Sequence, residues 1–437
     1  MIDFTKYHRL LDQSNPIRIY GKVSEIIGLV VEGQGPSASI GELCGIFPGG
    51  ADKPLPAEVV GFKKGNVLLM PLQSIQGLSP GCKIVSFGRK ASVSVGKNLL
   101  GRVINGLGSP IDNKGPLECE VEYPIYADPI NPLERGRIIE PVDLGIRALN
   151  GVLCCGKGQR MGIFAGSGVG KSVLLGMMAK NTNADVNVIG LIGERGREVR
   201  EFLEKNLGKE GLARSVVVVA GSDMHPLIRM RAAYVATSIS EYFRDRGKNV
   251  LLMLDSLTRF AMAQREIGLS VGEPPTAKGY TPSVFSLLPK LLERSGIMER
   301  GGSITGLYTI LVEGDDFNEP IADAARSILD GHIVLDRDLA SKNHYPAIDV
   351  LRSISRVMID IVDEEHRRLA SKIINILATY KKAEDLINIG AYVKGSNREI
   401  DYAITMIHQV NAFLKQNMDE KINFNQTREQ MQALFAI

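Results

Sequence analysis

The sequence predicts an α/β protein of three parts: a small N-terminal β-barrel, a central domain with a mostly parallel sheet, and a helical C-terminal domain. Three observations support this prediction. Short β-branched segments separated by Gly and Pro fill the first part of the chain, apolar runs alternate with helical stretches in the middle, and helical periodicity alone follows. We place the domains at 1–92, 93–362 and 363–437, with a linker over 93–132.

The composition is that of a globular chain long enough for several domains. Its 437 residues are 44% hydrophobic and 23% charged, and the net charge is +3. So small a net charge does not indicate a nucleic-acid partner. No membrane-spanning run or secretory signal is evident, and five scattered cysteines without a Cys-x-x-Cys spacing favour reduced thiols. We therefore expect a cytoplasmic protein.

The first part of the chain contains closely spaced short segments of strand character. They are Ile17–Val23, Leu29–Gly33, Ala57–Phe62 and Asn66–Met70. Such spacing predicts a small closed barrel. A barrel of this size could bind an oligonucleotide, but it would need aromatic platforms and basic residues on one face. Because aromatic residues are sparse here, the sequence favours a packing or ring-forming module.

The central part begins with the Pro- and Gly-rich stretch Gly101–Pro132, which we interpret as an ordered linker. Apolar runs without alternation follow, with helical stretches such as Ala232–Arg246 between them; the runs are Val186–Ile192, Ser215–Ala220, Val250–Leu254 and Ile304–Leu311. This pattern predicts a parallel sheet buried on both faces, with ligands beyond the carboxyl ends of the strands. The C-terminal part shows helical periodicity over Glu364–Lys382 and Ile400–Lys415.

A glycine-rich turn joins an apolar run to a helical stretch in the central part. The run ends at Ala165, and Gly166-Ser167-Gly168-Val169-Gly170-Lys171-Ser172 leads into the stretch that begins at Val173. Backbone amides and a helix N-terminus can then surround an anion, Lys171 can reach the β- and γ-phosphates, and the Ser172 hydroxyl can ligate Mg²⁺. Average residue usage gives about 0.03 chance matches to this pattern in such a length. The sequence therefore predicts a nucleotide-binding site.

Two carboxylates follow apolar runs of the predicted sheet. Asp255 comes directly after Val250–Leu254, where it can hold Mg²⁺ through water; a helix N-cap is the alternative role. Glu194 also lies at a strand end, where a carboxylate can orient and polarise water near the γ-phosphate. A surface ion pair of Glu194 with Arg195 or Arg197 is the alternative, and spacing alone leaves it open.

Several segments resemble the rotary ATPase α/β family. Tyr345–Arg356 is similar to the signature of that family, and Gly193–Arg195 and Glu241–Asp245 resemble its catalytic β subunits. The resemblance runs from the barrel to about Ser355. It implies a RecA-like P-loop ATPase domain that binds ATP and Mg²⁺.

Within this family, Asp255–Ile267 and Gly272–Phe285 resemble the export ATPases of type III secretion, which serve flagellar assembly and virulence injectisomes. Gly35–Cys44 is similar to the flagellar branch. The resemblance implies an ATP-hydrolysing subunit of the flagellar export apparatus, at the inner face of the cytoplasmic membrane. Its partners would be stalk and regulator proteins, the export gate and chaperone–substrate complexes, and hydrolysis would help deliver or unfold substrates and release chaperones.

The resemblance also implies roles for the residues around the phosphates. Glu194 corresponds to the catalytic carboxylate, Arg195 to a residue near the γ-phosphate and Arg259 to an arginine close to that carboxylate. The nucleotide would be bound by Ala165, Gly166, Ser167, Gly168, Val169, Gly170, Lys171, Ser172, Val173 and Tyr345, and Mg²⁺ by Ser172 and, through water, Asp255. Lys171 would also act in catalysis.

Two matches lie further along the chain. Tyr345 corresponds to an aromatic residue that packs on the adenine ring, although by itself it would be read as a core tyrosine. Arg356 corresponds to the arginine finger that enters the neighbouring subunit's site; a structural ion pair with Asp360 or Asp349 is the alternative. Because one chain carries both the catalytic carboxylate and the finger, we expect a homohexamer with sites between subunits.

Other functions stay open at this stage. A virulence-type secretion ATPase or a rotary ATP synthase β-type subunit is the alternative, although the C-terminal helices lack the acidic lever of rotary β subunits. An RNA-translocating ring is disfavoured by the sparse aromatics and the near-neutral charge. The segment from Met1 to about Val23 has apolar residues at helical spacing and could dock a partner or the membrane surface, or pack on the barrel.

Overall fold

The computed structural model describes residues 19–49, 51–312, 314 and 316–436. The chain forms two compact units, one of residues up to 92 together with 266–274, the other of residues 93–265 and 275–437. Most of the N-terminal segment Met1 to about Val23, for which docking and packing on the barrel were both open, lies outside the described residues. The proposed domain boundaries at 92 and 362 stay predictions.

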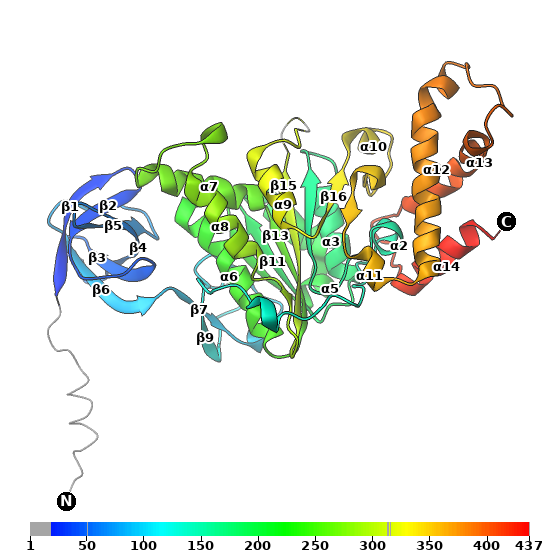
Figure 1. Ribbon diagram of the computed structural model, residues 1–437. Coiled ribbons are helices and arrows are strands. Elements are labelled where there is room, and N and C mark those ends of the chain that lie inside the picture. The colour runs from blue at the N-terminus through cyan, green and yellow to red at the C-terminus, as the bar shows by residue number, and fades with distance from the viewer. Residues whose placement is uncertain (1–18, 50, 313, 315, 437) are drawn as a thin grey trace, which may run out of the picture. The chain divides into compact units, whose positions relative to one another are not determined.

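The first unit contains the predicted β-barrel (Figure 1). Antiparallel strands close it in the order β1-β2-β5-β4-β3-β6; they are β1 (Tyr20–Ile27), β2 (Val30–Gln34), β3 (Glu42–Phe47), β4 (Leu55–Lys63), β5 (Asn66–Pro71) and β6 (Lys83–Lys90). Alternating apolar side chains such as Val31, Ile46 and Leu69 fill its interior. The sequence missed β3 and β6 because Gly45, Gly88 and several charged residues interrupt their apolar pattern.

The second unit is built on the predicted, mostly parallel sheet. Its strands lie in the order β17-β16-β10-β15-β13-β11-β12-β8, with β14 (Gly296–Ile297) beside β15. The parallel strands are β8 (Val103–Asn105), β10 (Arg160–Ala165), β11 (Val186–Ile192), β12 (Ser215–Ala220), β13 (Asn249–Asp255), β15 (Ser303–Leu311) and β16 (Gly331–Leu335); β17 (Ile354–Ser355) is antiparallel. The central strands are buried on both faces, as their unbroken apolar runs predict.

The stretch expected as a linker contributes to this sheet. β8 pairs with β12, so Val103–Asn105 is an edge strand of the sheet, and β9 (Val121–Pro124) forms a ribbon with β7 (Ser92–Val95). Gly106 follows β8, where a Cβ atom would lie 2.7 Å from the carbonyl oxygen of Ile228. Three residues between glycines and prolines are too short a run to signal a strand in the sequence.

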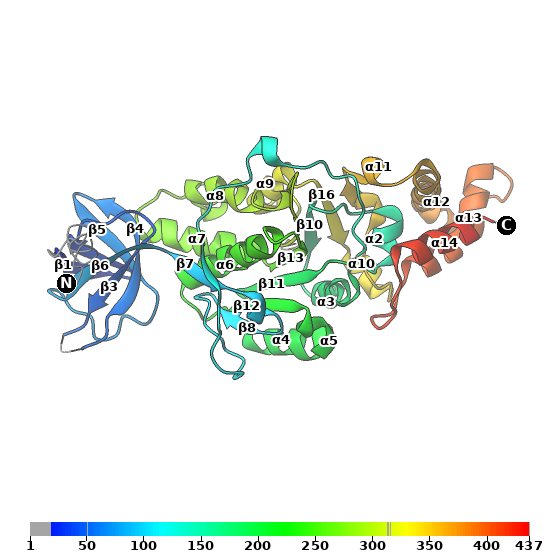
Figure 2. The ribbon, with the colours of Figure 1, turned by 90° about the horizontal axis from the view of Figure 1, so that it is seen from below.

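Helices cover both faces of the sheet, as Figure 2 shows for α3 and α6. The helices of this region are α2 (Arg147–Val152), α3 (Lys171–Asn181), α4 (Gly196–Glu201), α5 (Gly208–Ala213), α6 (Pro226–Arg244), α7 (Leu257–Ser270), α8 (Pro282–Leu292), α9 (Pro320–Ile328), α10 (Arg337–Ser341) and α11 (Met358–Ile361). A π-helical segment, Phe202–Leu207, joins α4 to α5.

The chain ends in the predicted helical region, formed by α12 (Glu364–Asn388), α13 (Arg398–Leu414) and α14 (Phe424–Leu434) (Figure 1). Asp363, Asn397 and Asn423 cap the N-termini of these helices through side-chain oxygens. Apolar residues at helical spacing, such as Ile373, Val410 and Met431, join the same core as α2 and β10.

A buried ion pair ties α6 to the segment after α8. The Arg294 guanidinium donates to both carboxylate oxygens of Glu241, at 2.8 and 2.6 Å, and also to the carbonyl of Ile125. The side chains of Arg294 and Glu241 are 1% and 8% exposed. Glu241 belongs to Glu241–Asp245, one of the segments that carry the family resemblance. Its role is therefore structural.

Arg294→Met is expected to lower the free energy of unfolding by about 3–5 kcal/mol, because Glu241 would stay buried without its partner. Arg428→Met is the matched control, since the Arg428 side chain is 34% exposed beside Asp363 and Glu365; it should cost under about 1 kcal/mol. Urea unfolding followed by circular dichroism measures both. Equal losses in the two variants would contradict a special role for the buried pair.

Candidate active site

The phosphate loop lies between the carboxyl end of β10 and the N-terminus of α3. Gly168 and Gly170 have φ angles of +79° and +90°, in the left-handed region that favours glycine. A Cβ atom at Gly168 would meet nothing within 4 Å, so the loop borders open space. The backbone N–H groups at the N-terminus of α3 have no side-chain cap. The loop therefore offers backbone donors and a helix N-terminus to an anion.

Lys171 lies between two carboxylates at this edge of the sheet. Its Nζ atom is 3.4 Å from Oε1 of Glu194 and forms a closer ion pair with Oδ1 of Asp255. The three side chains are 11%, 17% and 3% exposed, in the order Lys171, Glu194 and Asp255. β11 and β13 are neighbours in parallel register, so their carboxyl ends place Glu194 and Asp255 on either side of the lysine.

Two alternative roles were open from the sequence: a helix N-cap for Asp255, and a surface ion pair with Arg195 or Arg197 for Glu194. The observed contacts of both carboxylates differ from these. Asp255 is the last residue of β13; its carboxylate binds Lys171 and accepts a hydrogen bond from Oγ1 of Thr309 at 2.7 Å. Its described contacts are thus with the site and not with the amides of α7. Glu194 pairs with Lys171, whereas Arg195 is 81% exposed and lies 3.4 Å from Glu198. The structure does not bring the Arg195 side chain to the phosphate loop.

Burial raises the pKa of Glu194 to about 7, and the negative charges of Asp255 and Glu198 add to this shift, although Lys171 opposes it. For Lys171, burial lowers the pKa, but Asp255 and Glu194 outweigh burial and hold the pKa above its usual value. The site thus keeps a charged lysine beside a carboxyl group that changes protonation near neutral pH. A carboxylate with a pKa near the working pH suits general-base chemistry.

Arg259, on α7, packs against the residue that precedes Glu194. A Cβ atom at Gly193 would lie 2.9 Å from the Cβ and Cγ atoms of Arg259. Nε of Arg259 is buried and has no hydrogen-bond partner in the described part of the chain. A buried guanidinium nitrogen without an acceptor is costly, so this position suits an incoming anion.

Tyr345 borders a pocket of about 720 Å³ next to the phosphate loop. Its ring is 3.4 Å from the position that a Cβ atom of Gly170 would occupy, and the residue is 42% exposed. It is therefore not a core tyrosine. The pocket is also lined by Val173, Leu335, Pro346, Gln416 and Met418, among others. Its size and apolar lining suit a nucleotide base.

The segment Gln416–Asp419 closes this pocket and was missed by the sequence analysis. The backbone N–H of Gln416 donates to the carbonyl of Tyr345 at 2.9 Å, and its side chain bonds to the backbone of Arg147 and Gly145. The segment follows α13, far from the phosphate loop in sequence. No local pattern distinguishes it from an ordinary polar loop.

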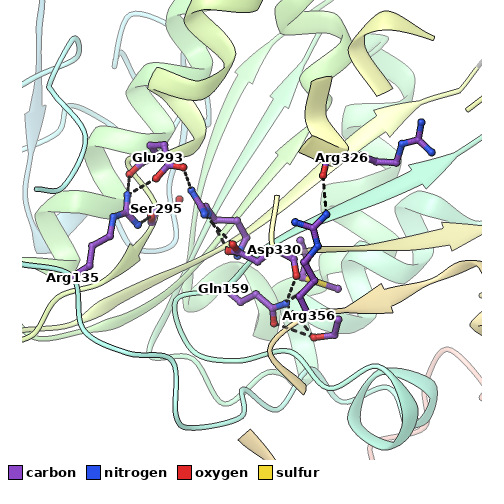
Figure 3. A network of polar contacts seen from close by, with 10 residues as sticks. Arg135, Gln159, Glu293, Ser295, Arg326, Asp330 and Arg356 are labelled. Carbon is purple, nitrogen blue, oxygen red and sulfur yellow. Dashed lines mark hydrogen bonds and ion pairs between the residues drawn. The ribbon is translucent and has the colours of Figure 1, made fainter. Parts of the chain in front are cut away.

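Arg356 lies beside Asp330 (Figure 3), at the end of β10 opposite to the phosphate loop. Its backbone N–H donates to Asp330, whose own N–H donates to Arg160, the first residue of β10. The five steps from Arg160 to Ala165 correspond to about 17 Å. The Arg356 side chain is exposed, and within the described residues its one polar contact is with the carbonyl of Arg326, at 3.4 Å.

The ion pairs considered for Arg356 are not present among the described residues. Asp349 caps the turn Val350–Arg352 and lies 3.9 Å from Lys381, whereas the Arg356 side chain donates to the carbonyl of Arg326. Arg356 is thus an exposed cation that is too far along β10 to reach the phosphates held by its own chain.

The residues at the loop fit a nucleotide. The glycine cradle and Lys171 provide donors at the phosphate loop, and within the described residues the buried Nε of Arg259 has no acceptor. No group of three or more His, Cys, Asp or Glu side chains in the described part of the chain could hold a metal by itself. Ser172, Asp255 and Glu194 line one small cavity, so a hydroxyl and carboxylates are available to a cation that phosphates and water would also coordinate. None of the helices in the described residues has the length and apolar character needed to cross a membrane.

Comparisons with protein families agree with this architecture. Residues 23–88 match the β-barrel domain of the ATP synthase alpha/beta family, and residues 145–355 match its nucleotide-binding domain. Residues 362–433 match the T3SS EscN ATPase C-terminal domain. The fold and the site therefore define an ATPase of the ATP synthase alpha/beta class.

Relatives over nearly the whole chain narrow this class. The chain is 55% identical to the flagellum-specific ATP synthase of Bacillus subtilis over 94% of both chains. It is 51% identical to the type 3 secretion system ATPase of Xanthomonas euvesicatoria over 94% of this chain and 93% of that one. The assembled ATPase EscN of enteropathogenic E. coli superimposes with a TM-score of 0.90 at 46% identity, covering 95% of this chain and 100% of that one. The chain belongs to the family of flagellar and type III secretion ATPases.

The carboxyl group of Glu194 is expected to titrate near pH 7 in the nucleotide-free protein. Because the folded-state pKa is raised, the stabilising contribution of the protonated group is complete below its usual pKa and is lost as pH rises through about 7. Carbon-13 NMR of glutamate-labelled protein measures this, with Glu194→Gln to assign the signal. Lys171→Met should raise the pKa further, since it removes the opposing charge. Titration of Glu194 at its ordinary pKa would contradict this account.

Proposed function

We propose that the chain hydrolyses MgATP in a homohexameric ring and couples hydrolysis to protein export at the flagellum. One observation carries the proposal. Each chain holds a phosphate loop, Lys171 and Glu194 at one end of β10, and an exposed arginine, Arg356, at the other. Since Arg356 cannot reach the phosphates of its own chain, it serves a neighbour.

A ring follows from this arrangement. An arginine finger supplied in trans stabilises charge in the transition state of phosphoryl transfer. If every chain both receives and lends such an arginine, identical copies make identical head-to-tail interfaces, and these close into a ring. The assembled ATPase EscN, with which this chain shares its fold, supports an assembled state here too.

Within each site, the residues divide the chemistry. Lys171 and the loop amides hold the β- and γ-phosphates, and Tyr345 packs on the adenine. Glu194, once deprotonated, orients and polarises the attacking water, while Arg259 steadies charge beside it. The sequence resemblance gives Arg195 a place near the γ-phosphate; in this structure its side chain lies at the surface beside Glu198, so this role would need the side chain to move. The phosphates would compete with Asp255 and Glu194 for the Lys171 ammonium, so nucleotide binding frees both carboxylates for their roles.

Mg²⁺, when bound, neutralises phosphate charge and polarises the phosphoryl oxygens. Ser172 would hold it directly and Asp255 through water. Asp255 is already positioned for this by the hydrogen bond from Thr309.

The export role rests on the relatives. The Bacillus subtilis relative is a flagellum-specific ATP synthase. In a solved complex, EscN is bound to its central stalk EscO, and the EscN of that complex superimposes on this chain with a TM-score of 0.88. By analogy, we infer a stalk partner for this ring, a cytoplasmic location with peripheral attachment at the inner face of the membrane, and contacts with regulators, the export gate and chaperone–substrate complexes. Hydrolysis would then help deliver or unfold substrates and release chaperones. No nucleic acid is involved.

Mixing two inactive variants tests the shared site. Glu194→Gln leaves a chain with an intact finger, and Arg356→Ala leaves one with an intact carboxylate. Each alone should lose most ATPase activity. In an equal random mixture, about a quarter of the interfaces combine an intact carboxylate with an intact finger, so activity should return.

Two controls frame this test. Arg367→Ala, which changes another exposed arginine, on α12, should keep full activity alone. Lys171→Ala should lose nucleotide binding, whereas Glu194→Gln should keep it and lose turnover. Full activity of Arg356→Ala alone, or no recovery in the mixture, would contradict a site shared between subunits.

The biological role is tested by capture of Glu194→Gln protein with ATP from its native cells, followed by mass spectrometry. Flagellar hook, rod or filament proteins with export-gate and stalk components are expected, because the arrested ring should retain its partners. Virulence effectors would assign the chain to the injectisome branch. Recovery of synthase γ- and α-type subunits, or of transcripts with RNA polymerase, would contradict the export role.

A further inference from the structure

We propose that Gln159 is a positioning residue for Arg356. Through it, the strand that carries a chain's own phosphate loop also fixes the arginine that the chain lends to its neighbour. The inference rests on the shared site proposed above. We use the name finger segment for Ile354–Arg356.

The Gln159 amide holds the finger segment from within the protein. The residue is 0% exposed, and its Nε2 atom donates to the carbonyl oxygen of Asp330 at 3.2 Å and to Oγ of Ser355 at 3.1 Å. The same carbonyl of Asp330 accepts the backbone N–H of Arg356, at 3.1 Å. Gln159 therefore contacts the Asp330 carbonyl, to which the Arg356 backbone is bonded, and the side chain of Ser355, which precedes Arg356 (Figure 3).

The other bonds of Ser355 and Gln159 determine which of their atoms donate and which accept. Ser355 donates its hydroxyl to the carbonyl of Cys154 at 2.7 Å, and Oε1 of Gln159 accepts the N–H of Gly156 at 2.8 Å. Since Oε1 is used in this way, the amide cannot turn over without losing bonds. A buried network in which every group is satisfied fixes the positions of its members.

The guanidinium of Arg160, the first residue of β10, holds the Asp330 carboxylate in place. Nε and Nη2 of Arg160 donate to the two carboxylate oxygens of Asp330 at 3.0 and 2.9 Å, and Arg160 also pairs with Glu293. Glu293 in turn lies 2.8 Å from Nη2 of Arg135. Figure 3 shows this chain of contacts running from Arg135 to the segment of Asp330 and Arg356. Bidentate contacts of this kind give geometric definition as well as energy.

The finger segment also approaches the sheet too closely for any side chain at Gly331. A Cβ atom there would lie 2.5 Å from the carbonyl oxygen of Ile354 and 2.7 Å from Sδ of Met161. Met161 is the residue of β10 that pairs with Gly331. The finger segment thus rests on β16 through backbone contact, β16 pairs with β10, and the Gln159 amide contacts both Asp330 and Ser355 at this place.

The consequence concerns the path between adjacent sites. β10 begins at the residue after Gln159 and ends at Ala165, where the phosphate loop starts. A displacement of this strand on nucleotide binding would be passed to the finger segment without an intervening loop. Rigid elements of this kind carry coupling between sites when they have two arrangements.

Gln159→Met removes the amide at similar side-chain length. It should lower turnover of the assembled ring about 10- to 100-fold, the cost of a misplaced catalytic group, and leave nucleotide affinity unchanged. Gln264→Met is the matched control, because Gln264 is also buried and donates to a serine hydroxyl, that of Ser283, at 2.9 Å. Gln264→Met should not regain activity selectively with Glu194→Gln, as is expected of Gln159→Met.

Mixing identifies which site the substitution damages. If Gln159 positions the finger, Gln159→Met should regain activity with Glu194→Gln, which supplies an intact finger, and none with Arg356→Ala. If Gln159 instead supports the phosphate loop of its own chain, recovery should appear with Arg356→Ala and fail with Glu194→Gln. The second pattern overturns the proposal.

The mixture of Glu194→Gln with Arg356→Ala separates the two proposals. Its failure would remove the shared site itself. Its success, combined with the second pattern, would remove only the role of Gln159. Ser355→Ala gives an independent reading should Gln159→Met not fold; it removes one partner of the amide and should show the same mixing pattern as Gln159→Met. Wild-type turnover in Ser355→Ala would also overturn the proposal.

Discussion

The parallel pairing of β10 with its neighbours is the constraint on which the site depends. It places the carboxyl ends of β10, β11 and β13 at one edge, so that Lys171 meets Glu194 and Asp255. It also leaves the opposite end of β10 beside β16 and β17, where Arg356 is held. One strand thus separates Arg356 from the phosphate loop by its own length, which is the basis for proposing a site shared between two chains.

Burial and attraction oppose each other at the phosphate loop. An ammonium between two carboxylates keeps its charge although it is nearly buried, while the more weakly paired Glu194 carries the cost of desolvation in a raised pKa. The charges of Lys171, Glu194 and Asp255 therefore balance one another internally. Within the described residues, the buried Nε of Arg259 has no hydrogen-bond partner. In the proposed mechanism, an incoming polyphosphate competes with the carboxylates for the Lys171 ammonium.

The features that could be predicted from the sequence are those encoded by local residue patterns. The phosphate loop depends on consecutive residues, and the buried strands β11, β12, β13 and β15 on unbroken apolar runs, so these were predicted nearly to the residue. β8 was missed because three residues carry no periodicity. Gln159 and Gln416–Asp419 were missed because their roles arise from contacts with segments more than 70 residues away, as the bonds from Gln159 to Asp330 and from Gln416 to Tyr345 show. Spacing likewise could not show that Arg195 points outward.

The most direct test of the shared site is a structure of the assembled ring with Mg²⁺, ADP and a γ-phosphate mimic. The account predicts that the nucleotide of each chain contacts Lys171 and Glu194 of that chain and the guanidinium of Arg356 from the adjacent chain, within hydrogen-bonding distance of the mimic. An Arg356 that stays on the carbonyl of Arg326 while the mimic is enclosed by one chain alone would contradict the central claim.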